Sequence, residues 1–235
     1  MRHFLVFLLM DAHFLVTYIP LFRRIPTFQL RRIASEASIE TVAKGGNYYR
    51  GLLTPRPLLF LLSGLVGVRE QATDCKRRYA PYLFTSQHWI LLNDNIVGAD
   101  SPLHLEIFRE SAIICLPYEL VHQLAKQDTQ FALQLLETAA KESIGLQTYT
   151  AQLIHLDAAG RLALFLLHLA REIFHNKHFK LPFRQDTIGS MLGLSREVVN
   201  RLLKQWCAEG IIQLKHHEIE LCNREVLEHT TKRNA

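Results

Sequence analysis

Residues Phe183 to Trp206 read FRQDTIGSMLGLSREVVNRLLKQW and predict two short helices that meet at a tight turn. Gly193 can adopt the left-handed conformation that ends a helix, and Ser195 can cap the helix that follows. Apolar residues recur at helical spacing on both sides of the turn, at Ile188, Met191, Leu192, Val198, Val199, Leu202, Leu203 and Trp206. The stretch therefore predicts a helix-turn-helix.

The second predicted helix has a polar face opposite its apolar face. Arg196 and Arg201 supply long donors of the kind that a recognition helix brings to base edges in the major groove. Arginine matches the paired acceptors of guanine, and a carboxylate such as Glu197 can accept from the cytosine amino group. A helical hairpin with a solvated charged face is the alternative interpretation. The coincidence of apolar spacing, turn glycine, cap and basic face favours DNA binding.

Residues Phe183 to Glu228 resemble the C-terminal domain of the Crp/Fnr family of bacterial transcription regulators. The resemblance includes the helix pair, the Ser195-Arg196-Glu197 start of the second helix, Arg201, and the entry to a wing at Glu209 to Ile212. In that family the wing is a β-hairpin, and Gln213 to Leu221 alternates accordingly, with a turn at His216-His217.

The resemblance also implies roles for individual side chains on this surface. It implies base readout by Arg196, Glu197, Asn200 and Arg201. It implies phosphate contacts by Gln185, Ser195, Lys204, Lys215 and His217.

Length and composition agree with a regulator of two domains. The chain has 235 residues and a formal charge of +5, from 27 basic and 22 acidic residues, which favours a polyanionic partner. Its four cysteines are far apart and form no CxxC pair, so they predict neither a metal knuckle nor a disulfide framework, and a reducing cytoplasm is the expected setting. We expect an α+β protein: a sensor β-barrel with an N-terminal helix at 1–127, a dimerisation helix and hinge at 128–157, and a winged helix-turn-helix at 158–235.

The N-terminal stretch MRHFLVFLLMDAHFLVTYIPLF begins like a signal peptide. Asp11 and His13 break the apolar run, which is shorter than the roughly 20 residues that span a bilayer, and no small-residue cleavage site follows. We expect a core helix and no membrane partner, with membrane contact as the alternative. Met10 is an alternative start to Met1.

The sensor half is predicted to be rich in β-strands. After a helix through Phe28 and Ile33, short apolar runs are punctuated by Gly, Pro and Asn. Leu61 to Val66 resembles the family's strand-turn-strand segment, and Ser111 to Pro117 resembles the last strand of its barrel. The resemblance implies a jelly roll of the cyclic-nucleotide-binding type.

The family's cyclic-nucleotide receptors hold phosphate with a Gly-Glu pair and an Arg-Ser/Thr-Ala step. This chain has Leu91-Leu92 and Ser101-Pro102 there, so a buried phosphate would lack its charge partner, and we do not expect cAMP or cGMP binding. The family's iron-sulfur sensors group cysteines near the N-terminus, but no cysteine precedes Cys75, so we do not expect a cluster either. Haem stays open through His13, His88 and His104. The effector is left unidentified.

Residues Asp128 to Leu156 predict one long helix. A broken a/d pattern marks one apolar face at Leu135, Ala139, Leu146, Tyr149, Leu153 and Leu156. Packing of this face on the chain's own barrel is one interpretation, whereas the resemblance implies a dimer interface. Asp157 to Gly160 is expected to be a hinge, followed by an apolar helix from Arg161 to Phe174.

These observations together predict a homodimeric regulator that binds a two-fold symmetric site on double-stranded DNA, with RNA polymerase as a partner implied by the resemblance. The alternatives are an effector-independent, constitutive or architectural DNA-binding protein, and a haem, gas or redox sensor of the same family. An enzyme is not expected, because the sequence has no Ser/His/Asp order, Gly-rich phosphate loop or HExxH.

Overall fold

The computed structural model describes residues 11–49, 57–70, 78–90, 92 and 103–232. The chain divides into two compact units, residues 1–71 with 83–145 and residues 72–82 with 146–235. None of the helices within the described ranges combines the length and the apolar character needed to cross a membrane.

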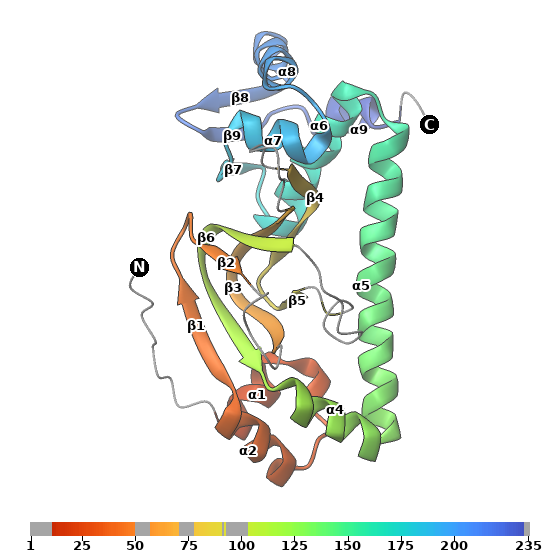
Figure 1. The fold of residues 1–235 in the computed structure, drawn as a ribbon. Coiled ribbons are helices and arrows are strands. Elements are labelled where there is room, and N and C mark those ends of the chain that lie inside the picture. Colours follow the sequence, from red (N-terminus) through yellow and green to blue (C-terminus); the bar gives the residue numbers. More distant parts are fainter. Residues whose placement is uncertain (1–10, 50–56, 71–77, 91, 93–102, 233–235) are drawn as a thin grey trace. The chain divides into compact units, whose positions relative to one another are not determined.

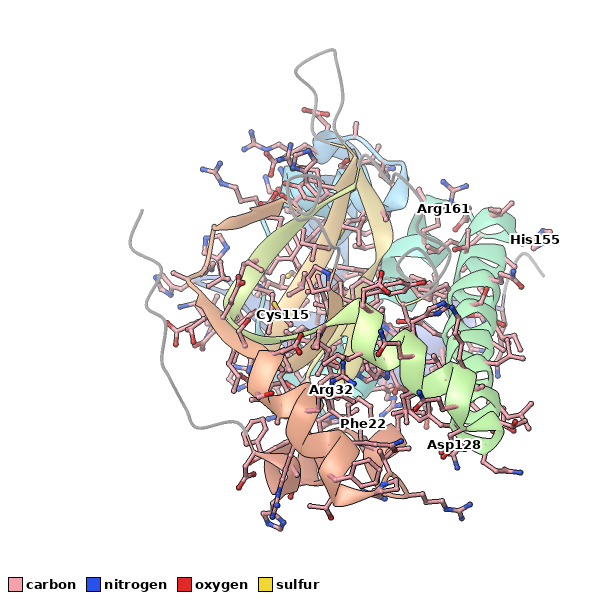
Figure 2. The ribbon with its side chains drawn as sticks, turned by 60° about the horizontal axis from the view of Figure 1, so that its bottom comes forward. Phe22, Arg32, Cys115, Asp128, His155 and Arg161 are labelled. Carbon is pink, nitrogen blue, oxygen red and sulfur yellow. The ribbon has the colours of Figure 1, made fainter. Side chains whose placement is uncertain are left out.

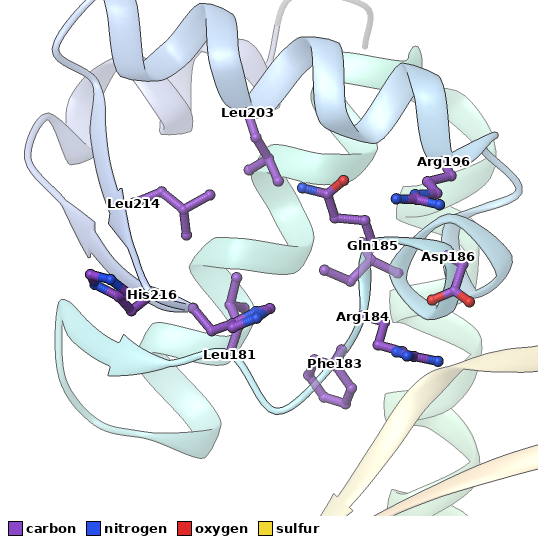
Figure 3. A pocket seen from close by; sticks show the side chains of 11 residues that line it. Leu181, Phe183, Arg184, Gln185, Asp186, Arg196, Leu203, Leu214 and His216 are labelled. Atoms are coloured by element: carbon purple, nitrogen blue, oxygen red, sulfur yellow. The ribbon is translucent and has the colours of Figure 1, made fainter.

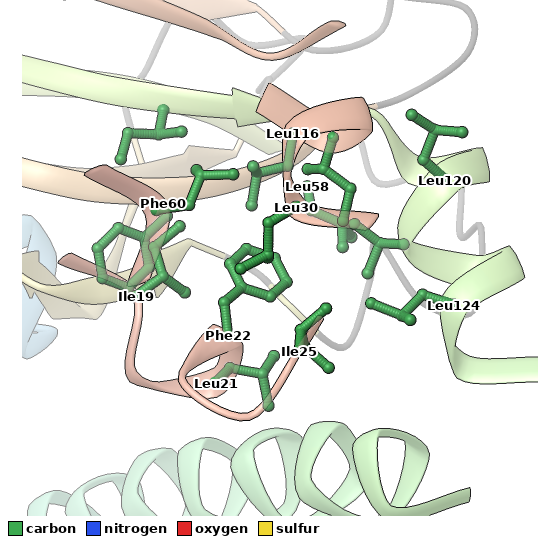
Figure 4. Close-up of a cluster of buried hydrophobic side chains, with 14 of the residues drawn as sticks. Ile19, Leu21, Phe22, Ile25, Leu30, Leu58, Phe60, Leu116, Leu120 and Leu124 are labelled. Atoms are coloured by element: carbon green, nitrogen blue, oxygen red, sulfur yellow. The ribbon is translucent and has the colours of Figure 1, made fainter. Parts of the chain in front are cut away.

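The first unit opens with short helices that enclose a hydrophobic core. They are α1 (Ala12–Tyr18), the 3-10 helix η1 (Pro20–Phe22) and α2 (Thr27–Glu36), and α4 (Tyr118–Gln127) follows the sheet. Leu30 and Ile33 of the predicted helix α2 are buried, whereas Phe28 is 71% exposed. Leu30 and Ile33 join a cluster around Phe22 (Figure 4). The Phe22 ring stacks on that of Phe131 at a centroid distance of 6.0 Å.

The strands of this unit form one sheet (Figure 1). They are β1 (Ser38–Val42), β2 (Asn47–Tyr49), β3 (Leu58–Glu70), β4 (Arg78–Thr85), β5 (His88–Ile90) and β6 (Leu103–Leu116). The order is β1-β6-β3-β4, while β2 also pairs with β6 and β5 with β3; the β1, β2 and β3 pairings with β6 are antiparallel. Because β6 pairs with three strands, the segment predicted as the last strand is central to the sheet.

The predicted strand-turn-strand at Leu61 to Val66 is wrong, because these residues lie within the single strand β3. The register of β3 against β6 shifts around Ser63 and Leu65, which identifies a bulged strand. Gly64 has φ +120°, and a Cβ there would collide with Ser111. The glycine therefore allows a close backbone approach instead of a chain reversal.

The long helix predicted between the domains is confirmed as α5, a 27-residue helix over Thr129–His155. Asp128 begins it, with its Oδ1 accepting from the Phe131 N–H at 3.0 Å. Figure 2 labels Asp128 and His155 at its two ends. The division into compact units falls within α5, after Gly145.

Of the segment predicted as a hinge, Asp157 to Gly160, the last three residues already belong to a helix. Asp157 is the N-cap of α6 (Ala158–His168), and its Oδ1 accepts from the Gly160 N–H at 2.7 Å. The bend after α5 is thus confined to Leu156 and Asp157. A π-helical turn, η2 (Leu169–Ile173), extends α6.

The rest of the second unit carries the helix-turn-helix and its wing. Its helices are α7 (Gln185–Leu192), α8 (Arg196–Ala208) and α9 (Arg224–Thr230). A three-stranded sheet in the order β7-β9-β8 contains β7 (His178–Lys180), β8 (Ile212–Lys215) and β9 (Glu218–Leu221).

Candidate nucleic-acid interface

The turn between α7 and α8 has the predicted geometry. Gly193 ends α7 in the left-handed conformation, with φ +65°, and its N–H donates to the Gly189 carbonyl. The Leu194 N–H donates to the same carbonyl at 2.8 Å. Ser195 caps α8, its Oγ accepting from the Val198 N–H at 3.3 Å. The predicted helix end and cap are both confirmed.

Gly189 is a structural requirement of this turn that sequence reasoning missed. A Cβ at Gly189 would lie 2.6 Å from the Leu194 carbonyl oxygen, closer than side chains pack. The absence of a side chain lets α7 press directly against the turn. Only the spacing of two glycines four residues apart signals this in the sequence.

α8 has one buried and one exposed face. Val199, Leu202, Leu203 and Trp206 are buried. Arg196, Glu197, Arg201 and Lys204 are exposed, and Asn200 is half-buried. The apolar residues therefore fix the rotation of α8, so that its charged face points to solvent.

The Glu197 carboxylate is held at the N-terminus of α8. Hydrogen bonds from its own backbone N–H and from the Ser195 hydroxyl lower the pKa of Glu197. The side chain is therefore ionised at neutral pH, as acceptance from a cytosine amino group requires.

The wing is a tight hairpin next to α7 and α8. β8 and β9 pair antiparallel up to Lys215 and Glu218. His216 and His217 connect them with φ +48° and +69°, which confirms the predicted turn. Two consecutive left-handed residues match the twist of a two-residue hairpin. Lys215 and both histidines are exposed.

An open groove of about 660 Å³ is lined by residues of α7, α8 and the wing (Figure 3). Three predicted contact residues, Gln185, Arg196 and His217, line it together. Asn200, Arg201, Lys204 and Lys215 are not among the residues that line it, and the side chains of Arg201, Lys204 and Lys215 lie exposed outside it. The groove also contains Arg184 and His216, which sequence reasoning did not assign. Arg184 immediately precedes α7, and its basic side chain beside Gln185 was the available signal.

α5 carries two apolar faces. Of the residues predicted for a dimer interface, Leu135, Ala139, Leu153 and Leu156 are buried within the chain, and Leu146 and Tyr149 are half-buried. The Tyr149 ring packs on His168 at a centroid distance of 4.9 Å. The opposite face exposes a second apolar stripe, which we call the α5 outer stripe: Leu133, Leu136, Ala140, Ile144, Ala151 and Ile154. Leu136, Ile144 and Ile154 are 61 to 66% exposed.

The candidate sensor residues do not form a cofactor site in the described part of the chain. Leu91, Ser101 and Pro102 lie outside the described residues, as does Cys75, whereas Leu92 is buried. The described cysteines are in β6, in α8 and after β9, and no group of three His, Cys, Asp or Glu side chains there is arranged to hold a metal. These cysteines do not fit an iron-sulfur cluster.

The three histidines considered for haem differ in environment. His13 and His88 are exposed. His104 is half-buried, and burial, together with the Arg69 charge, lowers its pKa. A neutral imidazole is the form that binds haem iron.

The fold and this surface define a winged helix-turn-helix protein with an N-terminal antiparallel β domain. Residues 160–230 match the Crp-like helix-turn-helix domain. Over 138 residues the chain is 28% identical to the fumarate and nitrate reduction regulatory protein of Vibrio cholerae, covering 57% of this chain and 55% of that protein. The chain thus spans about half the length of the curated relatives it matches.

Solved structures share this fold. A putative transcriptional regulator of the Crp/Fnr family from Eubacterium rectale superposes with a TM-score of 0.75 at 22% identity, covering 92% of this chain and 99% of that one. FixK2 from Bradyrhizobium japonicum superposes with a TM-score of 0.68 at 23% identity, covering 83% and 96%. The chain thus has the fold of these proteins, and its sequence is similar to that of regulators of the Crp/Fnr family.

Proposed function

We propose that the protein is a homodimeric transcription regulator that reads a two-fold symmetric DNA site with α8. The observation that carries the proposal is the exposed Arg196, Glu197 and Arg201 on a helix whose rotation is fixed by its buried face. α8 begins at the turn, and its N-terminal half is the part that enters a major groove in this motif. The geometry supports base readout by these side chains, with Asn200 beside them.

Phosphate contacts flank the base-reading face. Ser195 lies at the N-terminus of α8, where orphan backbone N–H groups favour anions. Lys204 extends the basic surface along α8, and Gln185 begins α7. The wing adds Lys215 and His217. These positions surround the proposed recognition surface on both sides, as backbone contacts do when they fix the register of a protein on DNA.

The α5 outer stripe is the proposed dimer surface. Its six apolar residues, with alanine at Ala140 and Ala151, follow one another along α5 at intervals of three, four, four, seven and three residues, which keeps them on one helix face. Pairing of two copies through α5 would place two α8 helices on one two-fold site, about one DNA turn apart. The residues on the opposite face of α5, which the sequence predicted as the dimer interface, would instead pack within each protomer.

The sensor domain is proposed to act without a cyclic nucleotide, because Leu91-Leu92 and Ser101-Pro102 replace the charged phosphate-binding positions. Any effector must bind the DNA-competent arrangement of the dimer more tightly than the other arrangement. RNA polymerase is the proposed partner of the DNA-bound dimer, on the basis of the similarity to Crp/Fnr regulators.

The test is selection from a randomised DNA pool by the purified protein without ligand, at two salt concentrations, with and without cell extract. A two-fold symmetric consensus is expected. Symmetry that emerges only with extract would mean that an effector is required. Strongly salt-dependent binding with no consensus under either condition would contradict sequence-specific regulation.

A further inference from the structure

Arg161 joins the end of α5 to the first helix of the helix-turn-helix. Its Nε donates to two carbonyls, Leu153 O and Leu156 O, each at 3.0 Å. Its Nη1 donates to the Leu192 carbonyl at 3.3 Å. Figure 2 labels Arg161 on α6, near the C-terminal end of α5. The guanidinium of Arg161, a residue of α6, thus binds the C-terminal ends of both α5 and α7.

The three acceptors are carbonyls at helix C-termini. Leu153 is in the last turn of α5, Leu156 follows it, and Leu192 is the last residue of α7. Carbonyls there lack partners within their helix and carry partial negative charge, so a cation is favoured. A shared N–H between two carbonyls is common at such ends. Arg161 therefore caps both helices at once, in a half-buried position.

The segment that connects α5 to α6 is closely packed. Besides the cap of Asp157 on Gly160, a Cβ at Gly160 would lie 3.0 Å from Leu156 Cδ2. A Cβ at Gly193 would lie 3.5 Å from Arg161 Nη1, so the guanidinium lies against the helix-turn-helix turn. The C-terminal end of α5, the start of α6 and the end of α7 are packed as one junction.

We propose that Arg161 is a positioning residue that sets the orientation of α7 and α8 relative to α5. The inference rests on the proposed function, in which α5 joins the two protomers. A rotation of α7 relative to α5 would then change the distance between the two α8 helices of the dimer, so that it no longer matches the distance between the two half-sites. Arg161 would not contact DNA; it would act by keeping two DNA-binding surfaces in matching positions.

This role affects two kinds of DNA differently. A full two-fold site is bound by both α8 helices, and its affinity includes the high effective concentration of the second helix. A half-site is bound by one helix alone. Loss of positioning lowers the affinity for the full site and leaves the affinity for the half-site unchanged. Loss of folding in the helix-turn-helix lowers both affinities.

The first measurement compares wild type, Arg161→Met and Arg161→Lys on a full site and on a single half-site, with thermal unfolding followed for each protein. Arg161→Met keeps most of the apolar stem and loses all three hydrogen bonds. Its full-site affinity is expected to fall about tenfold or more, with half-site affinity within about twofold of wild type. Arg161→Lys is expected to recover part of the loss, because its ammonium can donate to one helix end. Unchanged full-site affinity, or equal losses on both sites, would overturn the proposal.

A second measurement does not depend on DNA. Spin labels at Gln152→Cys on α5 and at the native, exposed Cys207 on α8 report the distance between the two helices, with the other cysteines replaced and the protein diluted with unlabelled chains. A narrow distance distribution is expected with Arg161 and a broad one with Arg161→Met. Identical distributions would overturn the positioning role. If the wild-type protein binds no specific DNA sequence, the proposed function fails. The distance distribution between the two spin labels still tests whether Arg161 positions α8 relative to α5.

Discussion

Gly189 and Leu194 meet so closely that a Cβ on Gly189 would lie 2.6 Å from the Leu194 carbonyl oxygen. The same two residues close the turn, because the Leu194 N–H donates to the Gly189 carbonyl at 2.8 Å. A side chain at Gly189 would have to push α7 away from the turn that begins α8.

Gly189→Ala is therefore expected to lower the free energy of unfolding by about 1–3 kcal/mol, the usual cost of overpacking. Urea unfolding of the full chain measures the change. Gly145→Ala is the matched control, because Gly145 lies within α5 with nothing within 4 Å of its added Cβ. This control is expected to stabilise the protein by about 0.5–1 kcal/mol. Equal effects of the two variants would argue against the close approach.

The lysine at the wing is expected to act on all DNA sequences alike. Lys215→Ala removes an exposed charge beside the hairpin turn. The slope of log affinity against log salt concentration should fall by about one, and the sequence preference should not change. Anisotropy titrations over a series of salt concentrations measure the slope. Arg31→Ala on α2 removes another exposed charge, from the other compact unit, and should leave the slope unchanged. A sequence-dependent loss with Lys215→Ala would count against a phosphate contact.

Sequence reasoning succeeded where the signal was local. Gly193, Ser195 and His216-His217 each act through the backbone within a few residues, so their types already predicted the turn, the cap and the hairpin. It failed where the partner is distant in the chain. Gly64 was interpreted as a turn because nothing nearby reveals the approach of Ser111.

The same limit applies to α5 and to its junction with α6. Leu135 and Leu136 are neighbours in sequence, yet one is buried and the other is exposed, and only packing decides which apolar face turns inward. The small residues after Asp157 suggested a flexible hinge, whereas the Asp157 side chain starts α6 there. A cap and a hinge share residue types, so composition alone does not separate them.

The α5 outer stripe is expected to be sensitive to charge. Ile144→Glu places a carboxylate in the middle of the proposed dimer surface, where it would be desolvated without a partner, and should shift the protein to monomers. Sedimentation equilibrium measures the shift. Gln152→Glu adds the same charge at an exposed position outside the stripe and should leave the dimer intact. A dimer that withstands Ile144→Glu would require a different interface.

Acid is expected to destabilise the second unit through His168. Burial against Tyr149 lowers the pKa of His168, although the Glu172 charge acts in the opposite direction. The unfolded chain, with an ordinary histidine pKa of about 6.5, then binds a proton more readily than the folded chain, so stability falls as pH drops through that value. His168→Gln should flatten the fall in melting temperature between about pH 7.5 and pH 5.5. His13→Gln, at an exposed position on α1, should not. Parallel curves for wild type and His168→Gln would show that His168 does not contribute.

The central claim is that α8 reads bases, and Arg201→Ala tests it most directly. Affinities of wild type and Arg201→Ala are measured on the selected site, on versions with each base pair replaced, and on random DNA. The account predicts a loss of about 1–3 kcal/mol on the selected site, with discrimination lost at one symmetric pair of positions and binding to random DNA little changed. Equal losses on the selected site and on random DNA would contradict base readout by α8.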